Sequence, residues 1–188
     1  MKIGFIGFGK VAKNLTGLID SENITFLTSA QNRLENTIEN MKKSDVEILD
    51  TFKEVAAFSD ILISANSPSQ ALDIAAEYGK YSKGIYIDLN NISPKTTLKI
   101  NEYVDNFVDG AIIGKIDAPN PVLYLSGKNL EKLDFLDDFL EVHKISENPG
   151  DVSKLKLLRS MYTKSLSAVL MESFEIAENL DLKDEFFD

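Results

Sequence analysis

The sequence predicts an α/β fold in which a doubly wound, mostly parallel sheet of about eight strands is followed by a long C-terminal helix. Short apolar runs alternate with helical patterns as far as residue 146, which is typical of successive βαβ units. The run at residues 60–65 is almost continuously apolar, as expected for a strand that is buried on both faces. Residues 152–180 contain no glycine or proline and therefore indicate one uninterrupted helix.

Each element has its own local signal. Apolar runs predict strands at residues 3–6, 23–28, 46–49, 60–65, 84–88, 107–112, 121–126 and 142–146. Helical patterns predict helices at residues 10–19, 33–43, 52–58, 67–78, 93–103 and 130–140. Two of these helices start at a serine that precedes a proline, because Ser67 and Ser93 can cap a helix and proline suits its first position. Gly79 is expected to end the helix that starts at Ser67.

The connection at residues 113–120 breaks the alternation of strands and helices. It contains Gly114 and Pro119, has no helical pattern and is too short for a crossover, so the strands on either side are expected to be antiparallel neighbours at a sheet edge. Further along, Asn148-Pro149-Gly150 predicts a domain boundary. We therefore expect one domain at residues 1–149 and a second at residues 150–188, which begins with the long helix.

The long helix carries a wide apolar stripe. Its members are Leu155, Leu158, Tyr162, Leu166, Val169, Ile176 and Leu180. A helix of about 29 residues is ~43 Å long, which exceeds the size of a sheet of this kind. The distal part of the stripe therefore needs a partner, and we expect a homodimer through this helix. A monomer in solution at micromolar concentration would contradict that expectation.

Composition excludes several classes of function. The formal charge of −10 argues against a nucleic-acid-binding protein, which needs a basic surface. The chain has no cysteine and a single histidine, His143, so disulfides, thiolate sites and histidine clusters are excluded and no metal site is expected. No apolar segment approaches the ~20 residues of a membrane span, and we expect the apolar run at the N-terminus to be a strand rather than a signal peptide. We expect a cytoplasmic protein with no role at a membrane.

The glycine pattern near the N-terminus predicts a dinucleotide site. Gly7 and Gly9 lie directly after the first apolar strand and before the first helix, and Ala12 takes the place of a third glycine. Glycine permits the tight turn and the close approach of a pyrophosphate, and the free amides of the helix N-terminus face the phosphates. The predicted pyrophosphate contacts are Gly7, Phe8, Gly9, Lys10 and Val11. The expected fold is therefore of the Rossmann type. A tight turn without a ligand is the alternative.

The end of the second strand favours NADP over NAD. Rossmann domains specific for NAD usually place an acidic residue there, but this chain has no carboxylate until Glu35. Thr28, Ser29 and Arg33 are instead predicted to hold the adenosine ribose, with a 2′-phosphate facing Arg33. NAD remains the alternative cofactor, and helix capping beside a solvated Arg33 is the alternative role of these residues.

Polar residues also follow the fourth and fifth strands. Ligands of open α/β sheets bind beyond the carboxyl ends of the strands, so Ala65, Asn66 and Asn90 are predicted on the nicotinamide side. Asn91 is a weaker candidate for a substrate contact. Asp88 is expected to brace the turn that follows its strand.

One side of the long helix is polar. At 100° per residue, Lys156, Ser160, Thr163, Lys164 and Ser167 fall together, away from the apolar stripe. A solvated face is the alternative to a functional one. A lysine held in a cleft, however, can have its pKa lowered by desolvation and can then exchange a proton with a substrate oxygen.

An ordered series of motifs resembles the β-hydroxyacid dehydrogenase and 6-phosphogluconate dehydrogenase superfamily, specifically its branch of phosphogluconate-dehydrogenase-like NAD-binding proteins. The series is Gly7-Phe8-Gly9, Tyr86 to Pro94, Phe107 to Ala111, Gly150 to Lys156 and Tyr162 to Lys164. The resemblance implies that a lysine at the start of the long helix is the general acid/base. By spacing from Gly150, this lysine is Lys156 rather than Lys154.

The chain departs from this family at three places. Many members place asparagine where this chain has Ser160, and the family's serine-glycine pair after the sixth strand is replaced by Ile113-Gly114. Ser160 and Lys164 are therefore weak substrate candidates, with Lys164 expected to bind a carboxylate, and the substrate is not implied. The family also has a multi-helix second domain, which commonly forms the dimer, whereas this chain stops at Asp188.

Three hypotheses follow. The first is an NAD(P)-dependent oxidoreductase acting on a small hydroxy acid, with Lys156 as its general acid/base. The second is an imine reductase resembling pyrroline-5-carboxylate reductase, whose N-terminus also looks like residues 2–7, although the segment from Asp88 to Pro94 and Lys156 count against it. The third is a non-catalytic NADP-binding protein or a truncated relative, which the end of the chain at Asp188 suggests.

Overall fold

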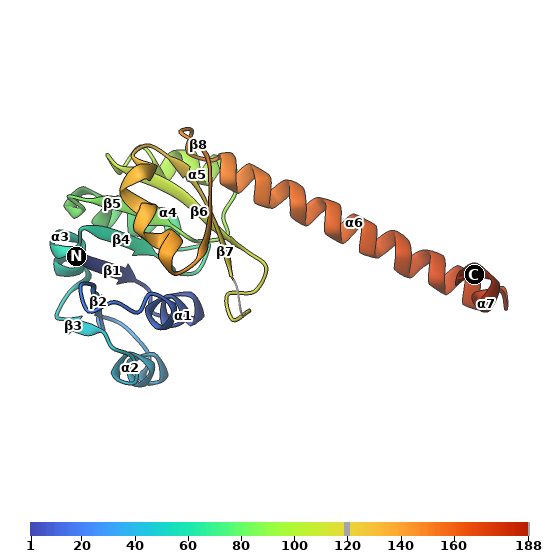
Figure 1. Ribbon diagram of the computed structural model, residues 1–188, viewed down its shortest axis with the longest axis horizontal. Helices are drawn as coiled ribbons and strands as arrows, with labels where there is room; N and C mark the ends of the chain where they lie inside the picture. The colour runs from blue at the N-terminus through green and yellow to red at the C-terminus, as the bar shows by residue number, and fades with distance from the viewer. Residues whose placement is uncertain (119–120, 188) are drawn as a thin grey trace. The chain divides into compact units, whose positions relative to one another are not determined.

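The computed structural model describes residues 1–118 and 121–187 and confirms the predicted Rossmann-like α/β fold (Figure 1). Its eight-stranded sheet has the order β3-β2-β1-β4-β5-β6-β7-β8. The strands are β1 (Lys2–Ile6), β2 (Thr25–Ser29), β3 (Glu47–Leu49), β4 (Ile61–Ser64), β5 (Ile85–Asp88), β6 (Phe107–Ile113), β7 (Val122–Gly127) and β8 (Glu141–Ser146). Among the described strands, only the β6–β7 pairing is antiparallel, as predicted, but β8 pairs parallel with β7 and takes the edge position instead. Residues 119–120 of their connection lie outside the described residues.

Helices cover both faces of the sheet. They are α1 (Lys10–Leu18), α2 (Glu35–Lys42), α3 (Phe52–Phe58), α4 (Ala71–Tyr78), α5 (Pro94–Ile100), α6 (Asp151–Asn179) and α7 (Lys183–Phe187), with 3-10 helices η1 (Gly79–Tyr81) and η2 (Leu130–Asp138). Side chains of α1, α2 and η2 pack into one hydrophobic core, which includes Ile3, Phe5 and Ile63 of the sheet. Side chains of α3, α4 and α5 pack into a second core with Ile6 and Leu62. Neighbouring residues of one strand thus enter opposite cores, which explains the continuous apolar runs.

Two local predictions were wrong in detail. Ser67 does not cap α4, which begins at Ala71 after Gln70. Residues 67–70 instead form a turn in which the amide of Gln70 donates to the Ser67 carbonyl at 3.0 Å and the Ser67 hydroxyl donates to the Gln70 side chain at 2.9 Å. Residues 130–138 form a 3-10 helix where a regular helix was expected. The equivalent cap at Ser93 was predicted correctly, because its side chain accepts the amide of Thr96 at 3.1 Å.

The chain divides into two compact units, residues 1–154 and 155–188. The first unit contains the sheet, the helices on its faces and the first residues of α6. The second unit comprises the rest of α6 together with α7, which the sequence did not predict. The boundary expected between residues 149 and 150 stays a prediction.

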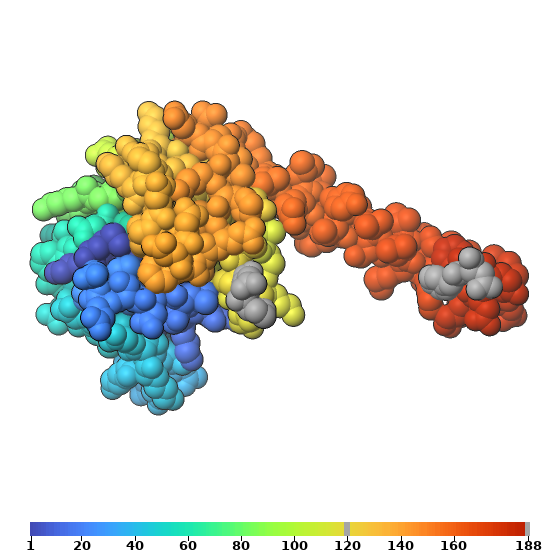
Figure 2. Space-filling model, viewed as in Figure 1, coloured from blue at the N-terminus to red at the C-terminus, as the bar shows by residue number. Residues whose placement is uncertain are grey.

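The second unit exposes many large apolar side chains. Within it, Figure 2 shows the orange and red surface of α6 as a rod one helix wide. Leu158, Met161, Tyr162, Val169 and Met171 are each more than half exposed. Homodimer formation through this surface stays a prediction. Among the described helices, none combines the length and the apolar character that crossing a bilayer requires.

Candidate functional site

The turn between β1 and α1 has the geometry of a phosphate-binding loop. Gly7 has a φ of +97°, and a Cβ there would lie 2.5 Å from the carbonyl oxygen of Ala65 and 2.6 Å from Oδ1 of Asn66. The chain itself therefore requires glycine at position 7. Gly9 is different, because its φ of −91° suits any residue and a Cβ there would meet no atom of the described residues within 4 Å, apart from its chain neighbours. The space in front of Gly9 is open to a ligand.

The N-terminus of α1 has no side-chain cap and no acidic residue in its first turn. Such a terminus presents unpaired amides and a partial positive charge to an anion. Phe8 is buried and packs edge-on against Phe5 at a centroid distance of 6.1 Å, so only its backbone can face a cofactor. Nζ of Lys10 lies 2.7 Å from Oδ2 of Asp117 in an exposed ion pair, and Val11 is partly buried against the core.

Polar side chains meet where β1, β4 and β5 end. The backbone amide of Asn66 donates to Oδ1 of Asn90 at 2.6 Å, and the Asn66 side chain donates to the carbonyl oxygen of Ile6. The Asn90 side chain donates to Ser64 and to Asp88, both at 2.9 Å. The predicted residues Ala65, Asn66 and Asn90 are therefore brought together beside Gly7. Asn91, by contrast, is exposed.

Asp88 is buried within this group and braces the turn, as expected, by accepting the backbone amide of Asn90 at 2.9 Å. Burial raises the pKa of the Asp88 carboxyl to about 7. The hydrogen bonds from Asn90 and Ser64 act against that shift, whereas the charge of Asp109 adds to it. Asp88 therefore binds a proton more tightly in the folded protein than in the unfolded chain.

This pKa predicts a pH-dependent stability. The contribution of Asp88 to folding is complete below the unfolded pKa of about 3.9 and is lost as the pH rises through the folded pKa of about 7. We expect Asp88→Asn to destabilise the protein more at about pH 5 than at about pH 8. The unfolding free energy of wild type minus that of the variant is expected to fall by roughly 1–3 kcal/mol between these two pH values. Urea unfolding of both proteins across this range measures the effect. A difference that is constant with pH would contradict it.

The hydroxyls predicted at the adenosine end are engaged within the fold. Thr28 is buried and donates to the carbonyl oxygen of Phe5 at 3.0 Å. Ser29 is also buried, donates to the carbonyl oxygen of Asp50 at 3.2 Å and accepts the amide of Gln31 at 3.2 Å. The hydrogen bonds of these two side chains stabilise β2 and the loop that follows it. A cofactor at this position would therefore contact the backbone of Thr28 and Ser29.

Arg33 lies within reach of the glycine turn. Its guanidinium carbon is 4.7 Å from the centroid of the Phe52 ring, and its Nη2 is 3.4 Å from Oδ1 of Asn66. Its Nε is buried and has no hydrogen-bond acceptor within the described protein. Burial lowers the pKa of Arg33 below its ordinary value, although the neighbouring Tyr78 acts against the shift. A buried donor without an acceptor fits a group that binds an anionic ligand.

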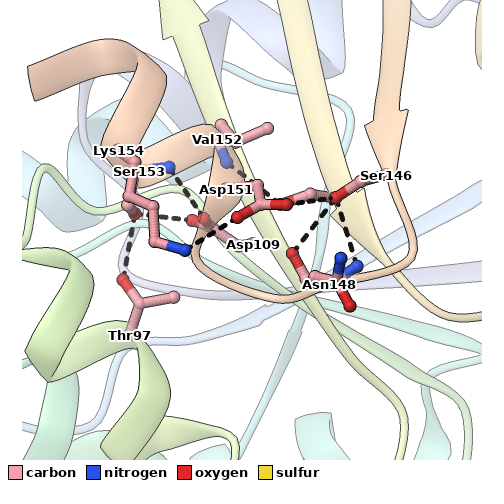
Figure 3. Close-up of polar contacts among 9 residues, drawn as sticks. Thr97, Asp109, Ser146, Asn148, Asp151, Val152, Ser153 and Lys154 are labelled. Carbon is pink, nitrogen blue, oxygen red and sulfur yellow. Dashed lines mark hydrogen bonds and ion pairs between the residues drawn. The ribbon is translucent and has the colours of Figure 1, made fainter. Parts of the chain in front are cut away.

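A buried polar row that the sequence did not predict crosses four adjacent strands. Ser64, Asp88, Asp109 and Ser126 are register partners from β4 to β7, and each is at most 2% exposed. Asp109 accepts the backbone amide and the hydroxyl of Ser153, each at 2.8 Å, in the first turn of α6 (Figure 3). Ser64 and Asp88 are the last residues of their strands, but Asp109 is the third residue of β6 and Ser126 the penultimate residue of β7. The register that aligns these four residues was not visible in the sequence.

Lys156, Ser160 and Lys164 all lie on α6 in the second unit. Lys156 and Ser160 are partly buried, whereas Lys164 is exposed. Their predicted roles stay predictions. Across residues 1–118 and 121–187, no group of three or more histidine, aspartate or glutamate side chains is arranged to hold a metal ion.

A known protein family matches the part of the chain that contains the glycine turn. Residues 2–92 match the family described as NADP oxidoreductase, coenzyme F420-dependent. Along its whole length, the chain is 45% identical to an uncharacterized 28.5 kDa protein encoded in the 7S RNA 5′ region of Methanothermus fervidus and covers 75% of it.

Solved structures extend the comparison. A conserved protein of unknown function, reported to be structurally similar to 3-hydroxyacid dehydrogenases, matches with a TM-score of 0.91 and 34% identity over 99% of this chain and 73% of its own. The 3-hydroxyisobutyrate dehydrogenase of Mycobacterium tuberculosis matches with a TM-score of 0.82 and 15% identity over 96% of this chain and 66% of its own. An imine reductase of Myxococcus stipitatus in complex with NADP+ has a TM-score of 0.73 and 19% identity over 99% of this chain and 70% of its own. The last two likenesses concern the fold alone.

Proposed function

Because this chain belongs to the β-hydroxyacid dehydrogenase and 6-phosphogluconate dehydrogenase superfamily, we propose that it binds NADP and oxidises or reduces a small hydroxy acid. When bound, NADP would supply hydride transfer to or from a carbinol carbon of the substrate. Lys156 takes the hydroxyl proton during oxidation and donates it during reduction. Lys164 is the candidate for the substrate carboxylate, with Ser160 and Asn91 as weaker substrate contacts.

The open space at Gly9 is the observation that carries this proposal. A residue other than glycine would fit there if packing within the chain were the only requirement. A glycine at a position with free space suits the close approach of a pyrophosphate, as in the Rossmann fingerprint. The uncapped N-terminus of α1 beside it supplies the amides of Lys10 and Val11 for the phosphate oxygens.

Arg33 supports NADP rather than NAD. Its guanidinium contacts Phe52 and Asn66, and its buried Nε has no acceptor among the described residues, which suits the binding of a ribose 2′-phosphate. No carboxylate lies at the end of β2 to bind a 2′-hydroxyl instead. Gly7, Ala65, Asn66 and Asn90 would line the rest of the cofactor, toward the nicotinamide.

Cofactor titration tests the assignment. NADPH is expected to bind more tightly than NADH, and Arg33→Ala is expected to weaken NADPH binding by about tenfold to a hundredfold while NADH binding changes by less than about threefold. Fluorescence titration of both reduced cofactors measures this. Lys53→Ala is the matched control, because Nζ of Lys53 also lies over a ring, 4.8 Å from that of Tyr81, and has no proposed cofactor contact. Equal weakening of both cofactors by Arg33→Ala would contradict the NADP assignment.

A turnover assay separates the three candidate functions. Oxidation of a hydroxy acid in a panel of small substrates, followed by the absorbance of NADPH, supports the dehydrogenase. Activity on a cyclic imine but on no hydroxy acid supports the imine reductase. Tight NADPH binding with no turnover of either class supports a non-catalytic NADP-binding protein.

We also propose that a second copy of the chain covers the apolar stripe of α6.

A further inference from the structure

The buried polar row links two parts of the first unit that are distant in sequence. At one end, Ser64 accepts the side chain of Asn90, which also bonds the backbone of Asn66 beside the glycine turn. At the other end, Asp109 and Ser126 hold the start of α6, where Ser126 accepts the amide of Val152 at 3.1 Å. Between these ends, Asp88 and Asp109 are direct register partners on neighbouring strands. The row therefore runs from the proposed nicotinamide side to the first turn of the long helix.

Asp109 forms the central anchor of that first turn. Its two carboxylate oxygens separately accept the amide and the hydroxyl of Ser153 (Figure 3). Asp109, Ser126 and Val152 are each at most 2% exposed, and Ser153 is 8% exposed, so water cannot readily replace these bonds. A carboxylate at a helix N-terminus is also stabilised by the helix dipole.

The hydrogen bond between Asp109 and Ser153 determines which hydroxyl donates in the neighbouring contact between Ser153 and Thr97. Because the Ser153 hydroxyl donates its one proton to the carboxylate, its oxygen is the acceptor in the 2.9 Å contact with the hydroxyl of Thr97 on α5. The Thr97 hydroxyl also lies 3.2 Å from the carbonyl oxygen of Ser93, so the two acceptors share one donor. Thr97 is completely buried. Three elements, α5, β6 and β7, thus fix residues 152 and 153. Consecutive hydrogen bonds that are each donated toward the same charged acceptor strengthen one another.

A second, outer set of bonds surrounds this anchor. Asp151 accepts the hydroxyl of Ser146 and pairs with Nζ of Lys154, both at 2.8 Å. The side chain of Lys154 is 60% exposed, so its ion pair contributes little. The buried bonds of Asp109, and not this surface pair, therefore determine how α6 starts.

Lys156 follows Ser153 by three residues on the same continuous helix. Residues at this spacing share a helix face, so a rotation or shift of the first turn moves Lys156 with it. We propose that Asp109 is a positioning residue, which sets the register of Lys156 by holding Ser153. This inference rests on the proposed function of Lys156, and it assigns to Asp109 a role without contact to the substrate.

Two measurements on Asp109→Asn test the proposal. Asparagine can accept only one of the two bonds from Ser153, so hydrogen exchange of the amides of residues 152–157 is expected to accelerate by at least about tenfold. A misplaced catalytic group costs up to about a hundredfold in rate, so kcat is expected to fall by about tenfold to a hundredfold. The Kd for NADPH is expected to stay within about twofold, because the glycine turn keeps its bonds. A purely structural role would weaken NADPH binding and kcat together.

Matched variants keep the test decisive if Asp109→Asn folds poorly. Thr97→Val removes the donor to Ser153 and is expected to lower kcat by about threefold to tenfold, whereas Thr97→Ser keeps the hydroxyl and restores activity. Asp151→Asn, in the outer set, is expected to change kcat by less than about threefold. Unchanged exchange at residues 152–157 in Asp109→Asn, or a wild-type kcat in Thr97→Val, would overturn the proposal. If wild type binds no NADPH, the proposed function fails, and the exchange data still decide whether Asp109 holds the first turn.

Discussion

Lys156→Ala is expected to lower kcat by about a hundredfold to ten-thousandfold, the range that one general acid/base contributes. The alanine variant keeps the helix, because alanine is the best helix former and Lys156 lies within the 29 residues of α6. The Kd for NADPH is expected to stay within about twofold of wild type, since the proposed cofactor contacts all lie in residues 7–90. Steady-state kinetics with the best hydroxy acid, together with fluorescence titration of NADPH, measures both quantities.

Lys154→Ala is the control that tests the spacing argument. Lys154 lies two residues away on the same helix and pairs with Asp151 in an exposed ion pair. Its replacement is expected to change kcat by less than about threefold. If Lys154→Ala abolishes turnover and Lys156→Ala does not, the wrong lysine has been assigned from Gly150. Equal turnover in all three proteins would remove both lysines from the mechanism.

Lys156→Arg distinguishes proton transfer by residue 156 from an electrostatic effect of its positive charge. Arginine keeps the positive charge, but it stays protonated at any accessible pH and cannot act as a base. We therefore expect Lys156→Arg to lose nearly as much activity as the alanine variant. A variant that keeps most of the activity would mean that the position supplies an electrostatic contact, with proton transfer carried out elsewhere.

Most of the fold could be predicted because its signals are local. The run from Asp60 to Ala65 is apolar at successive positions, and the structure buries all of Ile61–Ser64 between two cores. The Ser93-Pro94 cap was likewise readable from adjacent residues. The same pattern at Ser67-Pro68 was misleading, because Ser67 bonds Gln70 across a turn and the helix starts three residues later than a cap at position 67 would place it.

The site was less predictable because it depends on distances between strands. Gly7 was identified from its neighbours in sequence, but the residues that leave no room for a Cβ there, Ala65 and Asn66, belong to a distant segment of the chain. Thr28 and Ser29 looked available for a ribose, yet both hydroxyls are bonded to backbone carbonyls of other elements. The role of Asp109 depends on the register that pairs it with Asp88 and Ser126, and no local pattern specifies that register.

Gly9→Ala is expected to weaken NADPH binding by about tenfold to a hundredfold without lowering the stability of the protein. The φ of Gly9 is −91°, so alanine adopts the backbone without strain, and the added Cβ has no neighbour within 4 Å. Since no described residue beyond its chain neighbours lies there, the atoms that this Cβ would displace are those of a ligand held close to the main chain. A clash of this kind costs about 1–3 kcal/mol, and 1.4 kcal/mol corresponds to tenfold in Kd.

Gly17→Ala is the matched control, because a Cβ at Gly17 also has no neighbour within 4 Å among the described residues and Gly17 lies in α1, the helix that Gly9 directly precedes. Alanine there is expected to raise the unfolding free energy by about 1 kcal/mol, as usual for glycine in a helix, and to leave the Kd for NADPH unchanged. Thermal unfolding and cofactor titration of the two variants therefore separate packing from binding. A loss of stability in Gly9→Ala would mean that the chain itself needs this glycine. An unchanged Kd with unchanged stability would mean that no pyrophosphate lies against Gly9, which would remove the observation on which the NADP site is proposed.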